Sequence, residues 1–312
     1  MTQSEKGLTQ WVAQPATDLR AEHAEGPCWD PRLDALLWVD QFDGIVYLAD
    51  FDKADRLLQI CHRYQVGSPI GAVVPCAAEG SGWLVACAGG FAHLTETGGL
   101  TLLGQPEAGR EQTIRMNDGK CDPQGRFWAG SMAWSKEAKA GSLYRLDERL
   151  DVRTMLAGTT ISNGLAWAAD GATMYYIDTP TRRVDRFGFT ASGELLERRV
   201  AVAIPPGDGE PDGMCIDERG NLWIALWGGS SVRCYSPDGV LLAVVAVDAP
   251  QVSSCAFGGP TNRTLFITTS QEGMGEVTRR TYPQSGKVFC VDVNVAGPPT
   301  STFTPNLPGR EA

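Results

Sequence analysis

Residues 211–227 read Pro-Asp-Gly-Met-Cys-Ile-Asp-Glu-Arg-Gly-Asn-Leu-Trp-Ile-Ala-Leu-Trp. Asp212 and Gly213 stand at the head, a polar turn covers 217–221, and an apolar run covers 222–227. Turn residues between two short runs rich in apolar and β-branched residues are typical of a β-hairpin. The stretch therefore predicts two antiparallel strands with an acid at the start of the first.

The same pattern recurs along the chain. Short apolar or aromatic pairs follow turn-rich segments every 43 to 48 residues, at Leu37-Trp38, Trp83-Leu84, Phe127-Trp128, Tyr175-Tyr176, Leu222-Trp223 and Leu265-Phe266. Each period has room for about four strands, which is typical of a propeller blade. We therefore predict an all-β fold, a six-bladed β-propeller with four-stranded blades around a central channel. It forms a single domain over residues 1–312, with an N-terminal extension at 1–19 and a C-terminal tail at 297–312.

The composition excludes several classes of partner. The net charge of −10, from 27 Lys and Arg against 37 Asp and Glu, disfavours nucleic acid, which needs clustered basic residues. No apolar stretch reaches the roughly 20 residues of a membrane helix, and the first 20 residues lack the apolar segment of a secretion signal. Nine scattered cysteines without a C-x-x-C pair indicate reduced thiols and a cytoplasmic protein. The expected partner is a small molecule, and the chain is expected to be a monomer or a small homo-oligomer.

Placing the six repeats in register shows what lies ten to twelve residues ahead of each pair. The slots hold Glu25, Gly71, Asn117, Asn163, Asp212 and Cys255. Four of the six are oxygen-bearing side chains followed closely by glycine, and equivalent positions in a propeller face one channel mouth. An Asp or Asn beside Gly is more often a turn residue that caps its own backbone. A shared register across four repeats instead favours a ring of converging groups.

Two carboxylates and two amide oxygens form a hard-oxygen site. Such a site suits Ca²⁺, Mg²⁺ or Mn²⁺, and it also admits Zn²⁺ or Fe²⁺. So few protein ligands leave positions open for water and substrate, as a catalytic metal requires. Arg115 lies two residues before Asn117 and could hold an oxygen-rich ligand, although a surface salt bridge is about equally compatible with it. His23 could approach the site. No Ser/His/Asp or Cys/His set supports a nucleophilic enzyme.

Five segments together resemble the gluconolactonase family that includes senescence marker protein (regucalcin), six-bladed propellers that hydrolyse sugar lactones with one divalent metal. They are Ala24-Glu-Gly-Pro-Cys-Trp, the run from Arg115 to Met132, Ile161-Ser-Asn-Gly-Leu-Ala-Trp, Pro211-Asp-Gly-Met-Cys-Ile-Asp and Ser254-Cys-Ala-Phe-Gly-Gly. The resemblance implies that Glu25, Asn163 and Asp212 bind the metal, with Asp212 also the general base. It implies that Arg115 and Asn117 hold the lactone. Where regucalcin-like members carry a substrate-contacting glutamate, this chain has Trp134-Ser135, so Ser135 is the expected specificity position.

The predicted function is therefore metal-dependent hydrolysis of an aldonolactone, such as glucono-, xylono- or arabinonolactone, to the aldonic acid. Two alternatives stay open. One is an esterase or phosphotriesterase on the same propeller, which an apolar mouth bearing Trp134 and Trp227 would favour. The other is a propeller that binds a divalent metal without catalysis.

Overall fold

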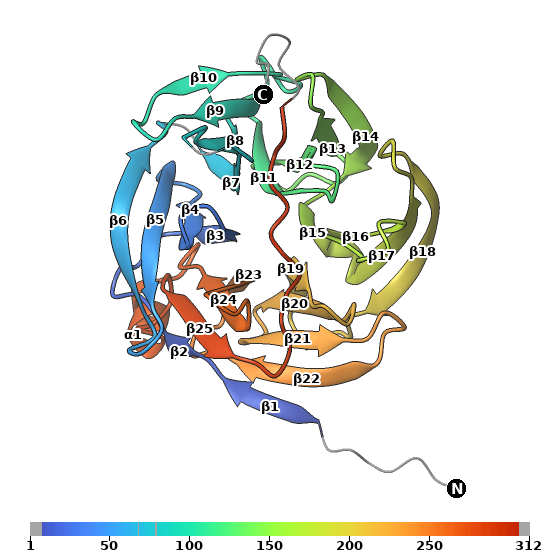
Figure 1. Cartoon of the computed structure of the whole chain (residues 1–312). Helices are drawn as coiled ribbons and strands as arrows, with labels where there is room; N and C mark the ends of the chain where they lie inside the picture. Colours follow the sequence, from blue (N-terminus) through green and yellow to red (C-terminus); the bar gives the residue numbers. More distant parts are fainter. Residues whose placement is uncertain (1–7, 68, 79, 306–312) are drawn as a thin grey trace, which may run out of the picture.

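A computed structural model describes residues 8–67, 69–78 and 80–305 and shows six sheets arranged as blades around a central channel (Figure 1). The six-bladed β-propeller prediction is confirmed. Each innermost strand contacts the innermost strands of the two neighbouring blades, which closes the ring. The first seven and last seven residues of the predicted extension and tail lie outside the described residues.

The blades follow one another in chain order. Blade 1 contains β3 (Ala24–Asp30), β4 (Ala35–Asp40), β5 (Ile45–Asp52) and β6 (Leu57–Gln65). Blade 2 contains β7 (Ile70–Pro75), β8 (Trp83–Cys87), β9 (Gly90–Leu94) and β10 (Leu100–Leu102). Blade 3 contains β11 (Ile114–Cys121), β12 (Phe127–Ala133), β13 (Gly141–Leu146) and β14 (Val152–Thr159). Blade 4 contains β15 (Ser162–Trp167), β16 (Thr173–Asp178), β17 (Arg183–Phe189) and β18 (Leu195–Ala203).

The last two blades borrow strands from the N-terminal segment. Blade 5 contains β19 (Glu210–Ile216), β20 (Leu222–Trp227), β21 (Ser231–Tyr235) and β22 (Leu241–Ala246), with β1 (Thr9–Val12) parallel to β22 as a fifth strand. Blade 6 contains β23 (Val252–Gly258), β24 (Thr264–Thr269) and β25 (Val288–Asp292), and β2 (Gln14–Pro15) is its outermost strand. Pairing of the two ends of the chain within one blade holds the ring closed.

The apolar pairs that revealed the repeat all lie on the second strand of their blade and form the core between blades. Trp38, Trp128 and Trp223 are among the largest fully or almost fully buried side chains. Acids in the first turns anchor two of these indoles: Trp128 Nε1 donates to Asp122 at 2.8 Å and Trp223 Nε1 donates to Asp217 at 3.1 Å, whereas Trp38 Nε1 has no acceptor among the described residues. These turn acids are structural, since a buried indole N–H without an acceptor is costly.

Every innermost strand carries a β-bulge near its start, including the steps Glu25/Cys28, Asn163/Leu165 and Pro211/Met214. A bulge re-aims one side chain, here toward the channel. The slot residues thus lie inside these strands. The glycine that follows Asp212 allows the next blade to approach closely, because a Cβ on Gly213 would lie 2.1 Å from Ser254 Oγ. Gly213 does not have positive φ. A tight turn is therefore not what requires this glycine.

Two features outside the blades complete the description. A helix, α1 (Glu276–Thr281), follows β24 and was not predicted, because six residues with none buried give no hydrophobic periodicity. No helix among the described residues is long and apolar enough to cross a membrane. All nine cysteines lie in the described part of the chain, and seven of them are buried. The C-terminal tail runs across one end of the channel (Figure 1).

Candidate active site

The mouth of the channel at the start of the innermost strands holds a cavity of about 60 Å³. Its lining brings together five of the residues singled out from the sequence: Glu25, Arg115, Asn117, Asn163 and Asp212. They come from β3, β11, β15 and β19, which are four different blades. Each is at most 6% exposed, so all five are held in fixed surroundings.

A chain of hydrogen bonds links the amides across three blades. Arg115 Nη1 donates to Asn117 Oδ1 at 2.5 Å, and Asn117 Nδ2 donates to Asn163 Oδ1 at 2.7 Å. Asn163 Nδ2 donates to Thr179 Oγ1 at 2.8 Å, and that hydroxyl donates to the carbonyl of Pro211 at 2.7 Å. Thr179 opens the short 3₁₀ turn η1 (Thr179–Thr181) after β16. The chain therefore ends beside Asp212 and fixes the relative position of the amides and this acid.

The carboxylates of the pocket have few partners. Glu25 accepts one hydrogen bond, from its neighbour Gly26 N at 2.9 Å, and no donor among the described residues reaches the Asp212 carboxylate. Burial, with a contribution from Asp118, raises the pKa of Glu25 to about 8. Burial and the charge of Glu25 raise the pKa of Asp212 well above its usual range. Because these buried acids repel one another, a bound cation in the pocket would stabilise their ionised forms.

These residues fit a divalent cation. Among the described residues no three His, Cys, Asp or Glu side chains group as a metal site, and the set here instead combines two carboxylates, Glu25 and Asp212, with the amide of Asn163. Oxygen donors of this kind suit hard cations. A cation between the acids would favour their ionised forms and offset their repulsion.

Arg115 is the cation nearest to this chain of amides, and it is held by two aromatic rings. Its guanidinium lies 5.2 Å from the centre of the Trp134 ring and 5.7 Å from that of Phe42. Burial lowers its pKa to about 10, which leaves it charged at neutral pH. In the described part of the chain only Nη1 of Arg115 has acceptors, namely Asn117 Oδ1 and the Met116 carbonyl. Its other N–H groups are available to a ligand.

His23 lies in the pocket as an aromatic wall residue. Its ring stacks on Phe42 with centroids 4.7 Å apart and meets the edge of Trp227 at 5.6 Å. Its Nδ1 lies 2.7 Å from Ser270 Oγ. Burial, followed by the charge of Arg115, lowers the pKa of His23 well below 6.5, so the imidazole is neutral.

A second set of lining residues follows the second strands, and the register of the first strands did not reveal it. It comprises Lys136 after β12, Thr179 after β16, Trp227 at the end of β20 and Glu272 after β24. Lys136 Nζ and a Glu272 carboxylate oxygen lie 3.6 Å apart and join blades 3 and 6 across the mouth. Because paired strands are antiparallel, the ends of the second strands meet the starts of the first. Trp227 is already expected from the sequence at an apolar mouth, and scanning both positions would have found the other three.

Two expected positions lie elsewhere. Ser135 is exposed and is not among the described residues that line the pocket, whereas its neighbour Lys136 is. Cys255 pairs with Ile267 beyond the bulge of β23, and its sulfur lies 3.6 Å from that of Cys215. The bulge residue of blade 6 is Ser253, whose hydroxyl donates to the Ala24 carbonyl at 2.6 Å. Blade 6 therefore uses this part of β23 to contact blade 1, and neither Cys255 nor Ser253 is among the described residues that line the pocket.

The arrangement of the blades agrees with comparisons with known proteins. The profile of the SMP-30/Gluconolactonase/LRE-like region matches residues 23–271. The chain belongs to this family. A 6-deoxy-6-sulfogluconolactonase from Pseudomonas putida is 33% identical over 278 residues, covering 88% of this chain and 92% of that protein. Regucalcin from Xenopus laevis is 33% identical over 273 residues, covering 85% and 89%.

A solved structure shows the same architecture. The crystal structure of a calcium-binding protein, regucalcin from Agrobacterium tumefaciens, aligns with a TM-score of 0.86 and 25% identity, covering 95% of this chain and 98% of that one. The resemblance drawn from the five sequence segments is confirmed. The fold and family together place this chain among sugar lactonase-like propellers.

Proposed function

We propose that this protein is a metal-dependent lactonase that opens the ester ring of a sugar lactone to give the aldonic acid. The observation that carries the proposal is the convergence of Glu25, Asn163 and Asp212 beside Arg115 and Asn117 in one buried pocket. Membership of a family with lactonases supports the reaction class. The expected cofactor is one divalent cation, Ca²⁺, Zn²⁺, Mn²⁺, Mg²⁺ or Fe²⁺, held by Glu25, Asn163 and Asp212.

The residues divide the work of hydrolysis. A bound divalent cation supplies Lewis-acid polarisation of an ester carbonyl and stabilises charge that develops on its oxygen. Asp212, once ionised, accepts a proton from the attacking water, a contribution of typically about 10² to 10⁴ in rate. It is suited to this role because no described donor competes for its carboxylate.

Arg115 orients the substrate. Its unused N–H groups face a pocket in which Nη1 is already fixed on Asn117 and the guanidinium is held between Phe42 and Trp134. A planar donor fork fixed in this way can hold the hydroxyl or ring oxygens of a lactone without losing much side-chain freedom. Asn117 transmits that position to Asn163 through their 2.7 Å hydrogen bond.

The test uses purified full-length protein and a panel of aldonolactones, with acid release followed in weak buffer. We expect hydrolysis of at least one lactone, loss of activity on chelation, and recovery with one of the five cations. Asp212→Ala should abolish turnover and retain the far-UV spectrum of the propeller. Near-normal turnover by Asp212→Ala would remove this residue from the mechanism.

The panel should include lactones with an anionic substituent. The Pseudomonas putida relative is by name a 6-deoxy-6-sulfogluconolactonase, and in this chain Lys136 and Arg115 line the pocket as cations. A preference for the charged lactone that is lost in Lys136→Met would assign Lys136 to the substituent. Equal rates on charged and uncharged lactones in both proteins would exclude that assignment.

One observation favours a second candidate, an esterase acting on aryl or other apolar substrates. The mouth carries aromatic rings, since Trp134 is 41% exposed beside Arg115, and Trp227 lines the pocket. Turnover of phenyl acetate or of a phosphotriester far above that of every sugar lactone would favour this reading. The absence of chelator-sensitive hydrolysis of any lactone would instead favour a propeller that binds a divalent metal without catalysis.

A further inference from the structure

The opposite end of the channel contains a second and larger cavity. Its volume is about 390 Å³, within the range of about 300 to 1,000 Å³ that small-molecule sites occupy. The innermost strands begin at the candidate active site and end here, so the two cavities lie at opposite ends of the same channel. The C-terminal tail passes over this end (Figure 1).

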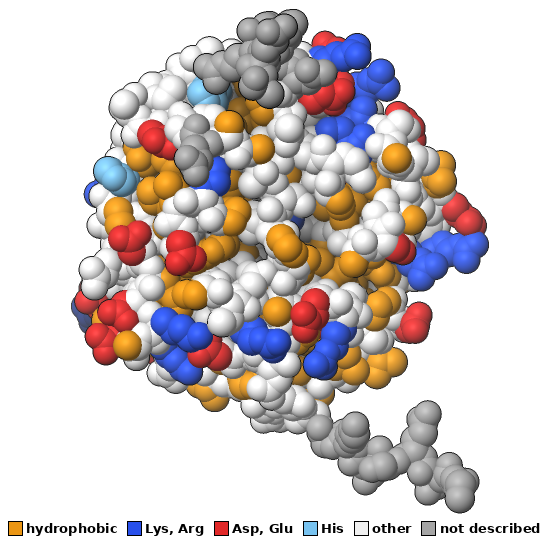
Figure 2. Space-filling view, in the orientation of Figure 1, with side chains coloured by type: hydrophobic (Ala, Val, Ile, Leu, Met, Phe, Trp, Pro, Cys, Tyr) orange, Lys and Arg blue, Asp and Glu red, His pale blue; other side chains and the backbone are white. Residues whose placement is uncertain are grey.

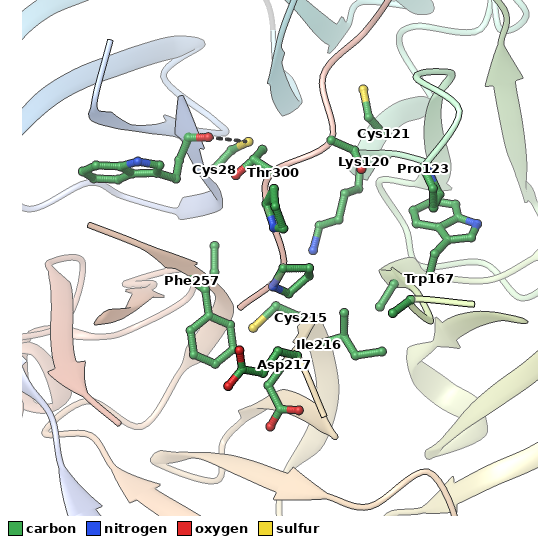
Figure 3. Close-up of a pocket in the computed structure, with 18 of the residues that line it drawn as sticks. Cys28, Lys120, Cys121, Pro123, Trp167, Cys215, Ile216, Asp217, Phe257 and Thr300 are labelled. Carbon is green, nitrogen blue, oxygen red and sulfur yellow. Dashed lines mark hydrogen bonds between the residues drawn. The ribbon is translucent and has the colours of Figure 1, made fainter. Parts of the chain in front are cut away.

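The walls of this cavity are mostly apolar. Trp167, Ile216 and Phe257 come from the ends of β15, β19 and β23, and Figure 3 shows them around one central space. Figure 2 shows that hydrophobic side chains gather around the middle of this face, while charged side chains stand mostly toward its rim. Apolar walls with few polar groups are typical of ligand sites.

One ammonium group points into the cavity. Lys120, near the end of β11, directs its side chain toward the middle of the space in Figure 3. Its Nζ donates to the Met214 carbonyl at 2.7 Å, the one acceptor it has in the described part of the chain. An ammonium carries three donors, so two remain available to a ligand.

Two of the three nearby carboxylates are engaged by other donors, and the third, Glu218, lines the cavity from an exposed position and forms no ion pair among the described residues. Asp217 also lines the cavity, but its oxygens accept from the backbone of Arg219 and Asn221 and from Trp223 Nε1. Asp118 lies within electrostatic range of Lys120, beyond ion-pair distance among the described pairs, and accepts from Gly119 N at 2.7 Å. Lys120 thus remains a positive charge in apolar surroundings without a direct anionic partner.

The cover of the cavity is held at its two ends. Gly297 N donates to the Asn262 carbonyl at 2.8 Å, and Phe303 N donates to the Pro75 carbonyl at 2.8 Å. No hydrogen bond joins residues 299–302 to the blades within the described coordinates. Thr300 and its neighbours therefore form a strap that crosses the cavity without a backbone hydrogen bond to the blades.

We propose that this cavity is a binding site for a small molecule with an apolar body and one carboxylate, the carboxylate accepting from Lys120 Nζ and the body packing against Trp167, Ile216 and Phe257. The site is independent of the proposed lactonase reaction, because none of its residues lines the other cavity. A charge-assisted hydrogen bond in apolar surroundings distinguishes the acid from its neutral analogue.

The test is calorimetric titration of the full-length protein with 4-phenylbutyrate and with its neutral analogue 4-phenylbutanamide. We expect one acid molecule per chain and at least about tenfold weaker binding of the amide. Lys120→Met should abolish the difference between acid and amide while a residual affinity for both remains. Lys53→Met, which changes an exposed lysine, is the matched control and should bind as the unmodified protein does.

Blocking variants locate the site. Ala168→Phe fills the cavity from its wall and should remove binding of both compounds, and Ala169→Trp does so from an exposed position that cannot disturb the core. Asp212→Ala should bind the acid normally, which separates this site from the lactonase pocket. Equal affinities for acid and amide, no binding of either, or binding that survives both blocking variants would each overturn the proposal.

Discussion

Thr179 offers a direct test of how the candidate metal site is held together, through the substitution Thr179→Val. The hydroxyl accepts from Asn163 Nδ2 at 2.8 Å and donates to the Pro211 carbonyl at 2.7 Å, so it ties an expected ligand of blade 4 to the residue preceding Asp212. Valine keeps the shape and removes both hydrogen bonds. Thr179 and Asn163 are 5% and 3% exposed, so water does not readily replace the lost partner.

The expected magnitude follows from the groups left unpaired. Each buried donor or acceptor that loses its partner costs about 1–3 kcal/mol. Loss of an outer hydrogen bond to a ligand typically weakens metal binding by about 10- to 100-fold. We therefore expect Thr179→Val to lower the free energy of unfolding by a few kcal/mol. We also expect it to weaken binding of the cation that restores activity by about 10- to 100-fold.

The assay is calorimetric titration of metal-free protein with the activating cation, together with urea unfolding. Thr181→Val is the matched control, because its hydroxyl donates to the Asp178 carbonyl at 2.7 Å in the same 3₁₀ turn and does not touch the pocket. Unchanged metal affinity in Thr179→Val, or the same loss in Thr181→Val, would refute the reasoning.

Three further predictions concern the same pocket. Asp212→Asn should lower kcat by about 10² or more, and it should raise the unfolding midpoint of the metal-free protein because burial disfavours the charge of Asp212. Asp217→Ala leaves the Trp223 indole N–H without its acceptor, so it should lower that midpoint and leave kcat unchanged. The opposite pattern would exchange the roles of the two acids. Cation at about 100 times its dissociation constant should add about 2.7 kcal/mol of stability, and no shift would contradict a specific site. Trp134→Ala should raise KM for the lactone about 2- to 30-fold by freeing Arg115, and an unchanged KM would exclude that support.

The fold could be predicted from the repeat because the repeated residues form the buried core between the blades. Each blade must bury a second strand against its neighbour, so pairs such as Phe127-Trp128 and Leu222-Trp223 recur at a fixed period. The same register separated Asp212 from Asp217, two acids five residues apart on one hairpin. Asp217 is fully engaged by the turn and an indole, whereas Asp212 sits at a bulge and faces the channel.

The structural reason for the glycines at the slot positions could not be predicted from the sequence. An Asn or Asp beside Gly indicates a tight turn, and among the slot glycines Gly26 does have positive φ. Gly71 and Gly213 instead leave room for the next blade, since a Cβ would lie 1.8 Å from the Asn117 carbonyl oxygen and 2.1 Å from Ser254 Oγ. Only the closed ring shows these approaches, because the neighbours lie about 40 residues away in the chain.

The ion pair between Lys136 and Glu272 shows most clearly why part of the site depends on the ring. The two residues are 136 positions apart and follow the second strands of blades 3 and 6, which face each other across the channel. Their separation of 3.6 Å is therefore set by the closure of the whole ring, and that closure depends on β2 completing blade 6. No local pattern encodes such a distance. Weakening the β2 pairing should consequently disturb the mouth of the pocket, although β2 contributes no residue to its lining.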